Sequence, residues 1–311
     1  MYRSYVHRDS RYMESLQGLI REQFGFDIIA ITPAKRGYWG ETWKLETSGD
    51  TYFVKLDYFA RHQILFRNSL AVVEYLCNNG ADFVGRVVKT RAGKLYAAFN
   101  SAILAVFEWI DGENIETDET KPFEYQMLCE VYRLSKPGFN IPRVEFSDDQ
   151  AHRFYSIWEN HRNFPSIIEQ HKEKLAHYSA RLSHFSAICK ADEQEIYITH
   201  GDAGGNFLAA KDRHYIVDWD EARYATLERD AWVMACRDWA LKLFNDTLER
   251  NKIPYKLRPE RLAFYCYHMF LLYLSELLTD FISHGDEKEI MSYFSKDNFI
   301  WERIRFADSV F

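Results

Sequence analysis

The first third of the chain carries short runs in which hydrophobic and polar residues alternate, a pattern typical of half-buried β-strands. Two of these runs, 38–47 (YWGETWKLET) and 51–59 (TYFVKLDYF), are separated by Ser48, Gly49 and Asp50. Because these three residues favour turns, the two runs predict a β-hairpin. Further runs of the same character occupy 27–31, 94–99 and 102–110.

Two helices are expected within this β-rich part. The segment 63–80 has hydrophobic residues at mostly helical spacing, with Leu70 and Val73 on one face, and it stops at Gly80. A second helix is predicted over 13–24. The N-terminal part therefore combines a sheet with helices.

Beyond a break at 111–114 (DGEN), helical periodicity dominates, and one β-rich stretch at 197–221 interrupts it. We therefore predict an α+β protein with two lobes: a small β-rich N-terminal lobe over 1–110 and a larger helical lobe over 111–311. The helices expected in the larger lobe cover 123–134, 166–189, 231–248, 261–282 and roughly 287–306.

Composition narrows the function classes. The chain has 311 residues, 47% of them hydrophobic, which supports a globular protein and gives no signature of disorder. Its net charge of −7 argues against a nucleic-acid partner, since such proteins normally present a basic face. An acidic balance suits a cationic small molecule, and solubility alone explains the charge equally well.

The cysteines and the apolar runs bear on the compartment. Five cysteines are scattered without a CxxC spacing, which is typical of reduced cytosolic thiols and argues against a zinc site. No stretch resembles a signal peptide, and no apolar run approaches the ~20 residues that a membrane span requires. The longest, 269–274 (MFLLYL), is interpreted as one stripe of a buried helix. We expect a cytoplasmic protein with no membrane partner.

The stretch 200–206 (HGDAGGN) gathers charged and amide side chains in a glycine-rich loop, which by itself also fits a simple turn. A hairpin turning at 211–213 would return Asp218 close to Asn206. One carboxylate and one amide oxygen at that place suit Mg²⁺, which leaves room for phosphate oxygens. Asp202 would then accept a hydrogen bond from a substrate hydroxyl, as in the phosphoryl-transfer template of kinases.

Lys55 is the upstream residue that strengthens this interpretation. Strand alternation places Lys55 and Asp57 on one face of the run 51–59, where an unpaired ammonium is costly. A nucleotide phosphate or the carboxylate of Glu74, on the following helix, would offset that cost. A solubilising lysine on an edge strand is the simpler alternative, and the downstream loop favours the phosphate-binding role.

Two other segments are candidates for nucleotide contacts. The stretch 35–45 (KRGYWGETWKL) has glycines at Gly37 and Gly40 and is a candidate loop over the nucleotide phosphates, although it is no GxGxxG motif. The connector residues Phe107, Trp109 and Ile110 are expected to offer backbone groups to a nucleobase.

The motifs THGDAGGNFL, IVDWDE and LERDAW, together with the surroundings of Lys55, resemble the aminoglycoside phosphotransferase family, within the wider group of choline-kinase-like small-molecule kinases. They are most similar to spectinomycin phosphotransferases and their relatives. The resemblance implies a bilobal protein-kinase-like fold, ATP or GTP as donor, Mg²⁺ as cofactor, and a hydroxyl of a small molecule as acceptor.

Residue by residue, the resemblance makes Asp202 the catalytic aspartate and makes Asn206 and Asp218 the Mg²⁺ ligands. Lys55, paired with Glu74, would hold the α- and β-phosphates. His200 would brace the loop through hydrogen bonds rather than take part in the chemistry. In the kinase template four residues separate the aspartate from the asparagine, and here three do. We expect the two glycines among them to adopt the conformations that this shorter loop requires.

The acceptor is the least determined part of the sequence-based hypothesis. Family members that phosphorylate cationic antibiotics line the acceptor site with carboxylates, and the candidates here are Asp220, Glu221, Asp238 and Glu276. Three hypotheses stay open: a kinase of an aminoglycoside or aminocyclitol, a kinase of a metabolite such as choline, a sugar or an amino alcohol, and a nucleotide-binding scaffold without turnover.

Overall fold

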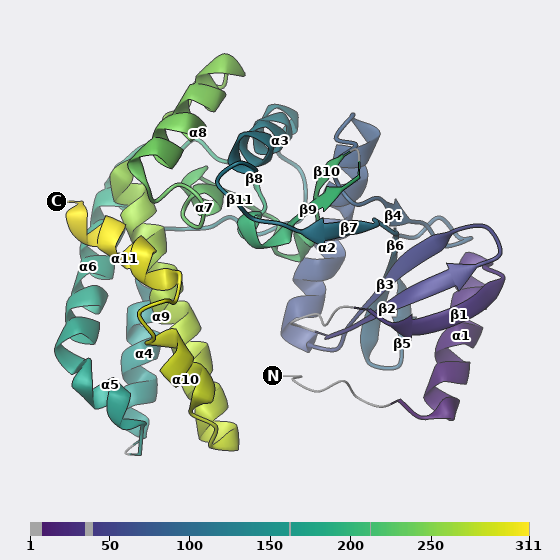
Figure 1. The fold of residues 1–311 in the computed structure, drawn as a ribbon, viewed down its shortest axis with the longest axis horizontal. Helices are drawn as coiled ribbons and strands as arrows, with labels where there is room; N and C mark the ends of the chain where they lie inside the picture. The colour runs from purple at the N-terminus through teal and green to yellow at the C-terminus, as the bar shows by residue number, and fades with distance from the viewer. Residues whose placement is uncertain (1–7, 35–39, 162, 212, 311) are drawn as a thin grey trace. The chain divides into compact units, whose positions relative to one another are not determined.

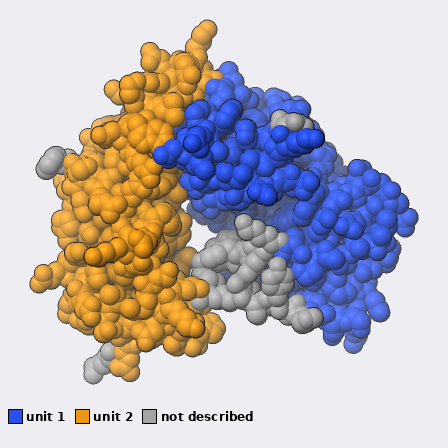
Figure 2. Space-filling view, in the orientation of Figure 1, with its two compact units in different colours: residues 1–142, 200–223 blue, residues 143–199, 224–311 orange. Residues whose placement is uncertain are grey.

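The computed structural model describes residues 8–34, 40–161, 163–211 and 213–310. The chain forms two compact units, coloured separately in Figure 2. The first unit comprises Met1–Pro142 and His200–Arg223, and the second comprises Arg143–Thr199 and Tyr224–Phe311. This division differs from the predicted boundary after residue 110, and it assigns the glycine-rich loop to the first unit.

The first unit is built around a six-stranded sheet in the order β1-β2-β3-β6-β4, with β5 also paired to β6 (Figure 1). All of its strand pairs are antiparallel. The predicted hairpin is confirmed, because β2 and β3 pair from Gly40–Asp57 to Glu46–Thr51. The strands are β1 (Ile28–Pro33), β2 (Gly40–Thr47), β3 (Thr51–Asp57), β4 (Val87–Val88), β5 (Ala97–Phe99) and β6 (Ala102–Glu108).

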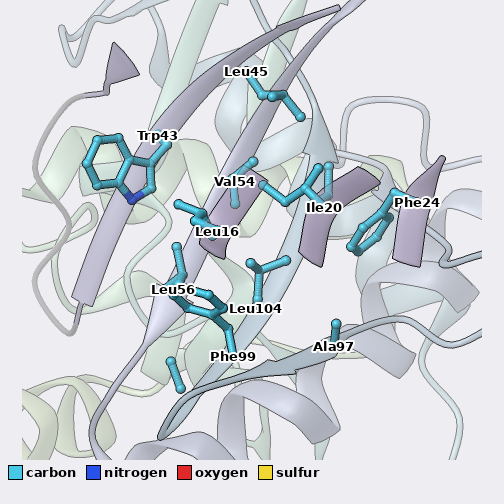
Figure 3. Packing of buried hydrophobic residues seen from close by; sticks show 12 residues of the cluster. Leu16, Ile20, Phe24, Trp43, Leu45, Val54, Leu56, Ala97, Phe99 and Leu104 are labelled. Atoms are coloured by element: carbon cyan, nitrogen blue, oxygen red, sulfur yellow. The ribbon is translucent and has the colours of Figure 1, made fainter. Parts of the chain in front are cut away.

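Helix α1 (Ser10–Phe24) covers one face of this sheet. Its buried residues Leu16 and Ile20 pack against Val54 and Leu56 of β3, in the core drawn in Figure 3. Since side chains alternate along a strand, this packing directs Lys55, which lies between Val54 and Leu56, to the other face. The predicted alternation along β3 is therefore confirmed.

Helix α2 (Ala60–Asn78) packs against β3, β6 and the turn η2 (Trp219–Glu221), so the other face of β3 is covered as well. It contains the segment predicted to be helical at 63–80. Helix α3 (Lys121–Leu134) also belongs to the first unit and contacts β10 (His214–Ile216).

A three-stranded sheet in the order β10-β9-β7 explains why 200–223 belongs to the first unit. Strand β9 (Phe207–Ala210) pairs with β10 on one side and with β7 (Gly112–Asn114) on the other. The break predicted at 111–114 is thus a short strand. Because β7 has no hydrophobic residue, the sequence pattern did not indicate it. Backbone pairing with β9 holds it, together with the Asn114 amide, which donates to the Gly205 carbonyl at 2.6 Å.

The second unit is mainly helical. Its long helix α9 (Pro259–His284) packs against α4 (Asp149–Asn160), α6 (Lys172–Ala191) and α11 (Ile300–Ser309). The remaining elements are α5 (Ser166–Gln170), β8 (Tyr197–Thr199), β11 (Arg223–Ala225), α7 (Glu228–Ala231), α8 (Asp238–Arg250) and α10 (Lys288–Tyr293), with β8 and β11 paired.

Helix α9 is also long and apolar enough to cross a membrane by length and composition alone. In the structure it serves as a core helix, since 61% of its most apolar window is buried inside the protein. Phe270, Leu271 and Leu274 are fully buried, as expected for the stripe at 269–274.

Three helical predictions in the second unit need correction. The helix expected at 231–248 begins at Asp238, because the chain leaves α7 in a non-helical segment at 232–237 that is buried over 232–236. The helices expected at 166–189 and 287–306 are each divided in two. Helix α4 was not predicted from the sequence. Periodicity locates buried faces well and interruptions of a helix poorly.

Candidate functional site

The hairpin β9–β10 brings the two predicted metal ligands together. Its register pairs Phe207 with Ile216, one residue after Asn206 and two residues before Asp218. The pairing continues past the strands, since the N–H of Val217 donates to the carbonyl of Asn206 at 3.0 Å. The predicted return of Asp218 to Asn206 is confirmed.

The loop before the hairpin holds Asp202 and Asn206 against each other. The turn η1 (Gly204–Asn206) orients the Asn206 amide so that its nitrogen donates to the Asp202 carbonyl at 2.8 Å and to Asp202 Oδ2 at 3.1 Å. Asp202 itself is exposed. Because the amide nitrogen is turned to Asp202, the amide oxygen is the atom left for a cation.

His200 braces this loop, as the sequence predicts. It is fully buried, and its Nε2 donates to the Val217 carbonyl at 2.8 Å. Its Nδ1 accepts from the Asp202 N–H at 3.2 Å, and its ring packs edge-on against Trp219. The neutral imidazole with a proton on Nε2 satisfies both bonds. His200 therefore joins the loop to the strand that leads to Asp218.

The glycines of the loop act differently from the prediction. Gly201 is the one with positive φ, at 92°, a conformation in which a side chain is strained. Gly204 and Gly205 lie in the turn η1. A Cβ on Gly205 would lie 3.2 Å from Asp202 Oδ1. Gly205 thus supplies room for the Asp202 carboxylate rather than an unusual backbone.

Asp218 has a left-handed backbone, with φ 64° and ψ 56°. For a residue with a side chain this conformation is uncommon and costs free energy. The turn η2 begins immediately after it, so the chain direction changes at Asp218. Outliers of this kind concentrate at functional sites, where the surrounding structure enforces them.

Lys55 binds the carboxylates of this segment. Its Nζ lies 2.6 Å from Asp218 Oδ1 and 2.5 Å from Asp220 Oδ2. The Lys55 and Asp220 side chains are each 8% exposed, whereas that of Asp218 is 44% exposed. The Lys55 ammonium thus lies inside the unit, and Asp218 connects it to the surface.

The predicted ion pair between Lys55 and Glu74 is wrong. Among the described residues, Glu74 pairs with Lys89, which directly follows β4. Lys55 pairs with Asp218 and Asp220. The helix α2 instead presents the ring of Phe66 to Lys55, 5.6 Å from its Nζ. Strand alternation predicted the face of Lys55, but it carried no information on which carboxylate that face meets.

The electrostatics reflect two carboxylates sharing one cation. Burial and the neighbouring Asp218 charge raise the pKa of Asp220 to about 7, against the lowering effect of Lys55. Burial would also raise the pKa of Asp218, but Lys55 outweighs it and the pKa is lowered. Burial opposes the charge of Lys55 too, and the two aspartates nevertheless raise its pKa. The segment carries a surplus of negative charge, which a bound cation would neutralise.

The predicted acceptor residues fall into two groups. Asp220 is held by Lys55, and Glu221 is bound by Arg223 at 2.7 Å, so these contacts argue against an acceptor role for both. Asp238 is exposed at the first residue of α8, and Glu276 is half-buried on α9. Both of these belong to the second unit.

Most of the residues predicted to contact the nucleotide either lie outside the described residues or are engaged in the sheet. Gly37 lies outside the described residues. Gly40 pairs with Asp57, and a Cβ there would lie 1.8 Å from the Leu56 carbonyl, so only glycine fits. Phe107 lies between β3 and β4 in the sheet, and the Trp109 N–H donates to the Thr51 carbonyl.

Sheet pairing therefore occupies Phe107 and the Trp109 donor, which argues against a nucleobase contact through Phe107 or the Trp109 N–H. A contact through the Trp109 carbonyl stays a prediction. Ile110 lies past the last paired residue of β6, Glu108. Its role as a nucleobase contact stays a prediction.

Sequence reasoning missed a charged cluster beside Lys55. His62 Nδ1 lies 2.6 Å from Asp57 Oδ2, and its Nε2 lies 3.4 Å from Glu221 Oε1. Asp57 is fully buried. The one available signal was the alternation that places Asp57 on the same face as Lys55.

A protein-family model and several solved structures match this chain. The model of a family described as "Phosphotransferase enzyme family" matches residues 30–265. The comparison with curated proteins finds no match. Among solved structures, spectinomycin phosphotransferase in complex with ADP and spectinomycin has a TM-score of 0.79 at 16% identity, and the match covers 94% of this chain and 98% of that one.

Two further structures are similar over nearly their whole length. Amicoumacin kinase, in complex with AMP-PNP and Ca²⁺, has a TM-score of 0.67 at 14% identity, covering 100% of this chain and 97% of that one. Choline kinase from Streptococcus pneumoniae has a TM-score of 0.65 at 12% identity, covering 96% and 98%. These likenesses confirm the predicted α+β, kinase-like fold with a β-rich and a helical part.

Proposed function

The chain belongs to the phosphotransferase enzyme family, and we propose that it transfers the γ-phosphoryl group of ATP or GTP to a hydroxyl group of a small organic acceptor. The family match confirms the predicted resemblance and the predicted enzyme class. The donor, the metal and the acceptor are the proposed parts, and each has its own support.

One observation carries the proposal: an exposed Asp202 carboxylate stands beside Asn206, and the β9–β10 hairpin after Asn206 returns the chain to Asp218. Phosphoryl transfer needs positioning and charge stabilisation more than covalent chemistry from the protein. An ionised aspartate accepts a hydrogen bond from the attacking hydroxyl without a shifted pKa. Asp202 is proposed as that group.

Mg²⁺ fits the residues around Asp218. The metal prefers oxygen ligands and is commonly bound through one or two protein groups together with substrate phosphates. The Asn206 amide oxygen and the Asp218 carboxylate supply ligands of this kind, and the surplus negative charge of the segment favours a cation. When bound, the metal would neutralise charge on the phosphates; Asn206 and Asp218 would hold it.

Lys55 is proposed to bind the nucleotide phosphates from the sheet side. Its ammonium is held by Asp218 and Asp220, so it is fixed in place before nucleotide arrives. A preorganised charge needs little rearrangement to stabilise another charge. Gly40 begins the strand opposite Asp57, where the tight approach of β2 and β3 fixes the end of the candidate phosphate loop.

For the acceptor, an aminocyclitol or aminoglycoside is the first candidate. The structure with the highest of the three TM-scores, 0.79, contains spectinomycin. The net charge of −7 suits a cationic acceptor. A cationic metabolite such as choline is the second candidate, because a choline kinase shares the fold over 96% of this chain.

The test is a panel of acceptors. We expect ADP or GDP release in the presence of Mg²⁺ with an aminocyclitol, and its loss in Asp202→Asn. Release with choline alone would assign the metabolite role. Growth protection by the expressed gene would identify an antibiotic as the acceptor. Nucleotide binding without turnover on every acceptor would contradict the proposal and favour the scaffold hypothesis.

A further inference from the structure

His62 occupies the junction of three segments in the first unit. It lies in the first turn of α2, and it is buried, with 7% of its surface exposed. One ring nitrogen meets Asp57 at the end of β3, and the other faces Glu221 at the end of η2. Two of these segments adjoin a residue of the proposed site, since Lys55 lies on β3 and Asp218 immediately before η2.

The two carboxylates that face His62 are themselves fixed. Asp57 Oδ1 accepts from the Phe59 N–H at 2.8 Å, which secures the beginning of α2. Glu221 Oε2 accepts from Arg223 at 2.7 Å through one guanidinium nitrogen and at 3.2 Å through another. His62 is therefore held between two anchored anions rather than at the end of a mobile side chain.

A link between α2 and the site is needed for a kinase-like unit. In protein kinases an ion pair between the strand lysine and a glutamate of the corresponding helix provides it. Here Glu74 pairs with Lys89, so α2 reaches the site by other contacts. These are His62 to Glu221 and the Ser69 hydroxyl, which donates to the Asp220 carbonyl at 3.0 Å.

We propose that His62 is a positioning residue that acts as a charged bridge, holding the Asp218–Glu221 segment in register with Lys55 through Asp57 and Glu221. This inference rests on the proposed phosphotransferase function of the site. His62 touches neither substrate nor phosphate in it. It acts by fixing the two segments between which the nucleotide phosphates and their cation would bind.

The charge of the bridge follows from its neighbours. Burial alone would lower the pKa of His62, but Asp57 and Glu221, with Asp220 nearby, raise it to about 9. The groups that face the ring are thus the carboxylates of β3 and of η2. Because the pKa lies above the ordinary value of about 6.5, the bridge is complete at neutral pH and is lost as the pH rises through about 9.

The experiment uses two replacements that each keep one half of the bridge. His62→Asn keeps a donor near the position of Nδ1, toward Asp57, and His62→Gln keeps one near Nε2, toward Glu221. His152→Gln is the matched control, since its side chain is 77% exposed on the second unit. Each His62 variant is expected to weaken nucleotide binding on the order of tenfold, and the control is expected to leave it unchanged.

The pH profile separates positioning from mere packing. Wild-type nucleotide affinity, measured by calorimetry with a non-hydrolysable triphosphate and Mg²⁺, is expected to fall above pH 9, and the profiles of both His62 variants are expected to be flat there. A His62 variant that melts earlier but keeps wild-type affinity and the same alkaline fall would overturn the proposal.

A readout without nucleotide keeps the test independent of turnover. The His62 ring signal, assigned by its loss in His62→Gln, is expected to titrate near pH 9 and to move toward 6.5 in Glu221→Gln. Titration of the wild-type ring near 6.5 would overturn the proposal. Failure to phosphorylate any acceptor would count against the proposed function, while the affinity and ring titrations would still decide the role of His62.

Discussion

Both units bury a network of charged groups, and the two networks differ in whether they reach the protein surface. In the second unit, Glu228 is fully buried and both of its carboxylate oxygens accept hydrogen bonds, one from the Tyr255 hydroxyl at 2.7 Å and one from the Arg258 N–H at 2.8 Å. Arg261 donates to the same hydroxyl and to the Glu193 carbonyl. Both oxygens of the buried carboxylate are therefore satisfied inside the second unit, and in this sense the network is closed.

In the first unit, the network around Lys55 does not close. Asp218 carries it to the surface from a strained backbone, and Asp220 shares the one ammonium and has its pKa raised. A closed network stabilises a fold, whereas an open one with surplus charge retains affinity for a ligand. The contrast explains why the two charged clusters are assigned different roles.

The largest expected effect is on Asp202, which is exposed in the loop before the hairpin that leads to the open network. Asp202→Asn is expected to lower kcat on the order of 10²–10⁴-fold, because the amide accepts the substrate proton poorly. Nucleotide affinity should persist, since Lys55 and Asp218 are unchanged. Steady-state ADP release and calorimetric nucleotide binding measure the two, with Asp246→Asn on the surface of the second unit as control. Turnover surviving in Asp202→Asn would remove the assigned role.

The second effect concerns the cation of the open network. Lys55→Met leaves Asp218 and Asp220 together without a counter-charge, and the nucleotide KM is expected to rise by at least about tenfold. The stability loss is expected to approach the ~3–5 kcal/mol of a broken buried pair, because the Lys55 and Asp220 side chains are each only 8% exposed.

Adding Asp220→Asn to Lys55→Met tests the shared charge directly. The double variant is expected to regain melting temperature without regaining nucleotide affinity, since it removes one buried carboxylate and restores no ammonium. Equal nucleotide KM values for the wild type and Lys55→Met would show that the lysine serves stability alone.

In the closed network, Tyr255→Phe should act on stability only. The change removes one donor to Glu228 and one acceptor for Arg261, and it is expected to cost about 1–3 kcal/mol in the free energy of unfolding. Urea denaturation measures the loss, and kcat and nucleotide KM should remain within about twofold. A fall in kcat at unchanged stability would mean that the second network also serves the reaction.

The smallest effect is expected at Glu74. It pairs with Lys89, whose side chain is 52% exposed, so Glu74→Gln should cost less than about 1 kcal/mol. The nucleotide KM is expected to change by less than about twofold. A rise in KM like that of Lys55→Met would instead mean that Glu74 reaches Lys55 when nucleotide binds, as the sequence-based hypothesis has it.

The glycine-rich loop shows which features of the site can be predicted from the sequence. The hairpin after Asn206 and the return of Asp218 follow from local turn and strand chemistry, and the family resemblance implies the bracing by His200; the structure confirms all three. The short loop predicts unusual backbone conformations at Gly204 and Gly205, yet among the glycines of the loop the one with positive φ is Gly201. The backbone conformation of a loop depends on the segments that pack around it, and a local sequence pattern does not identify these segments.

The short strand β7 is a second case. Gly112–Asn114 has a turn-like composition, and it forms a strand because β9 offers it backbone partners. Those partners lie almost a hundred residues further along the chain, so no local sequence pattern indicates them. The same pairing moves the boundary between the units, which the sequence placed after residue 110.

The sequence by itself determined which residue types stand on which face: Lys55 on the face of β3 opposite Val54 and Leu56, and Asp202, Asn206 and Asp218 around one hairpin. Only the tertiary structure decided the partners across the fold. Lys55 meets an aspartate 163 residues away, and His62 meets Glu221. The physical reason is that periodicity reports the direction of a side chain, whereas an ion pair depends on which distant segment packs there.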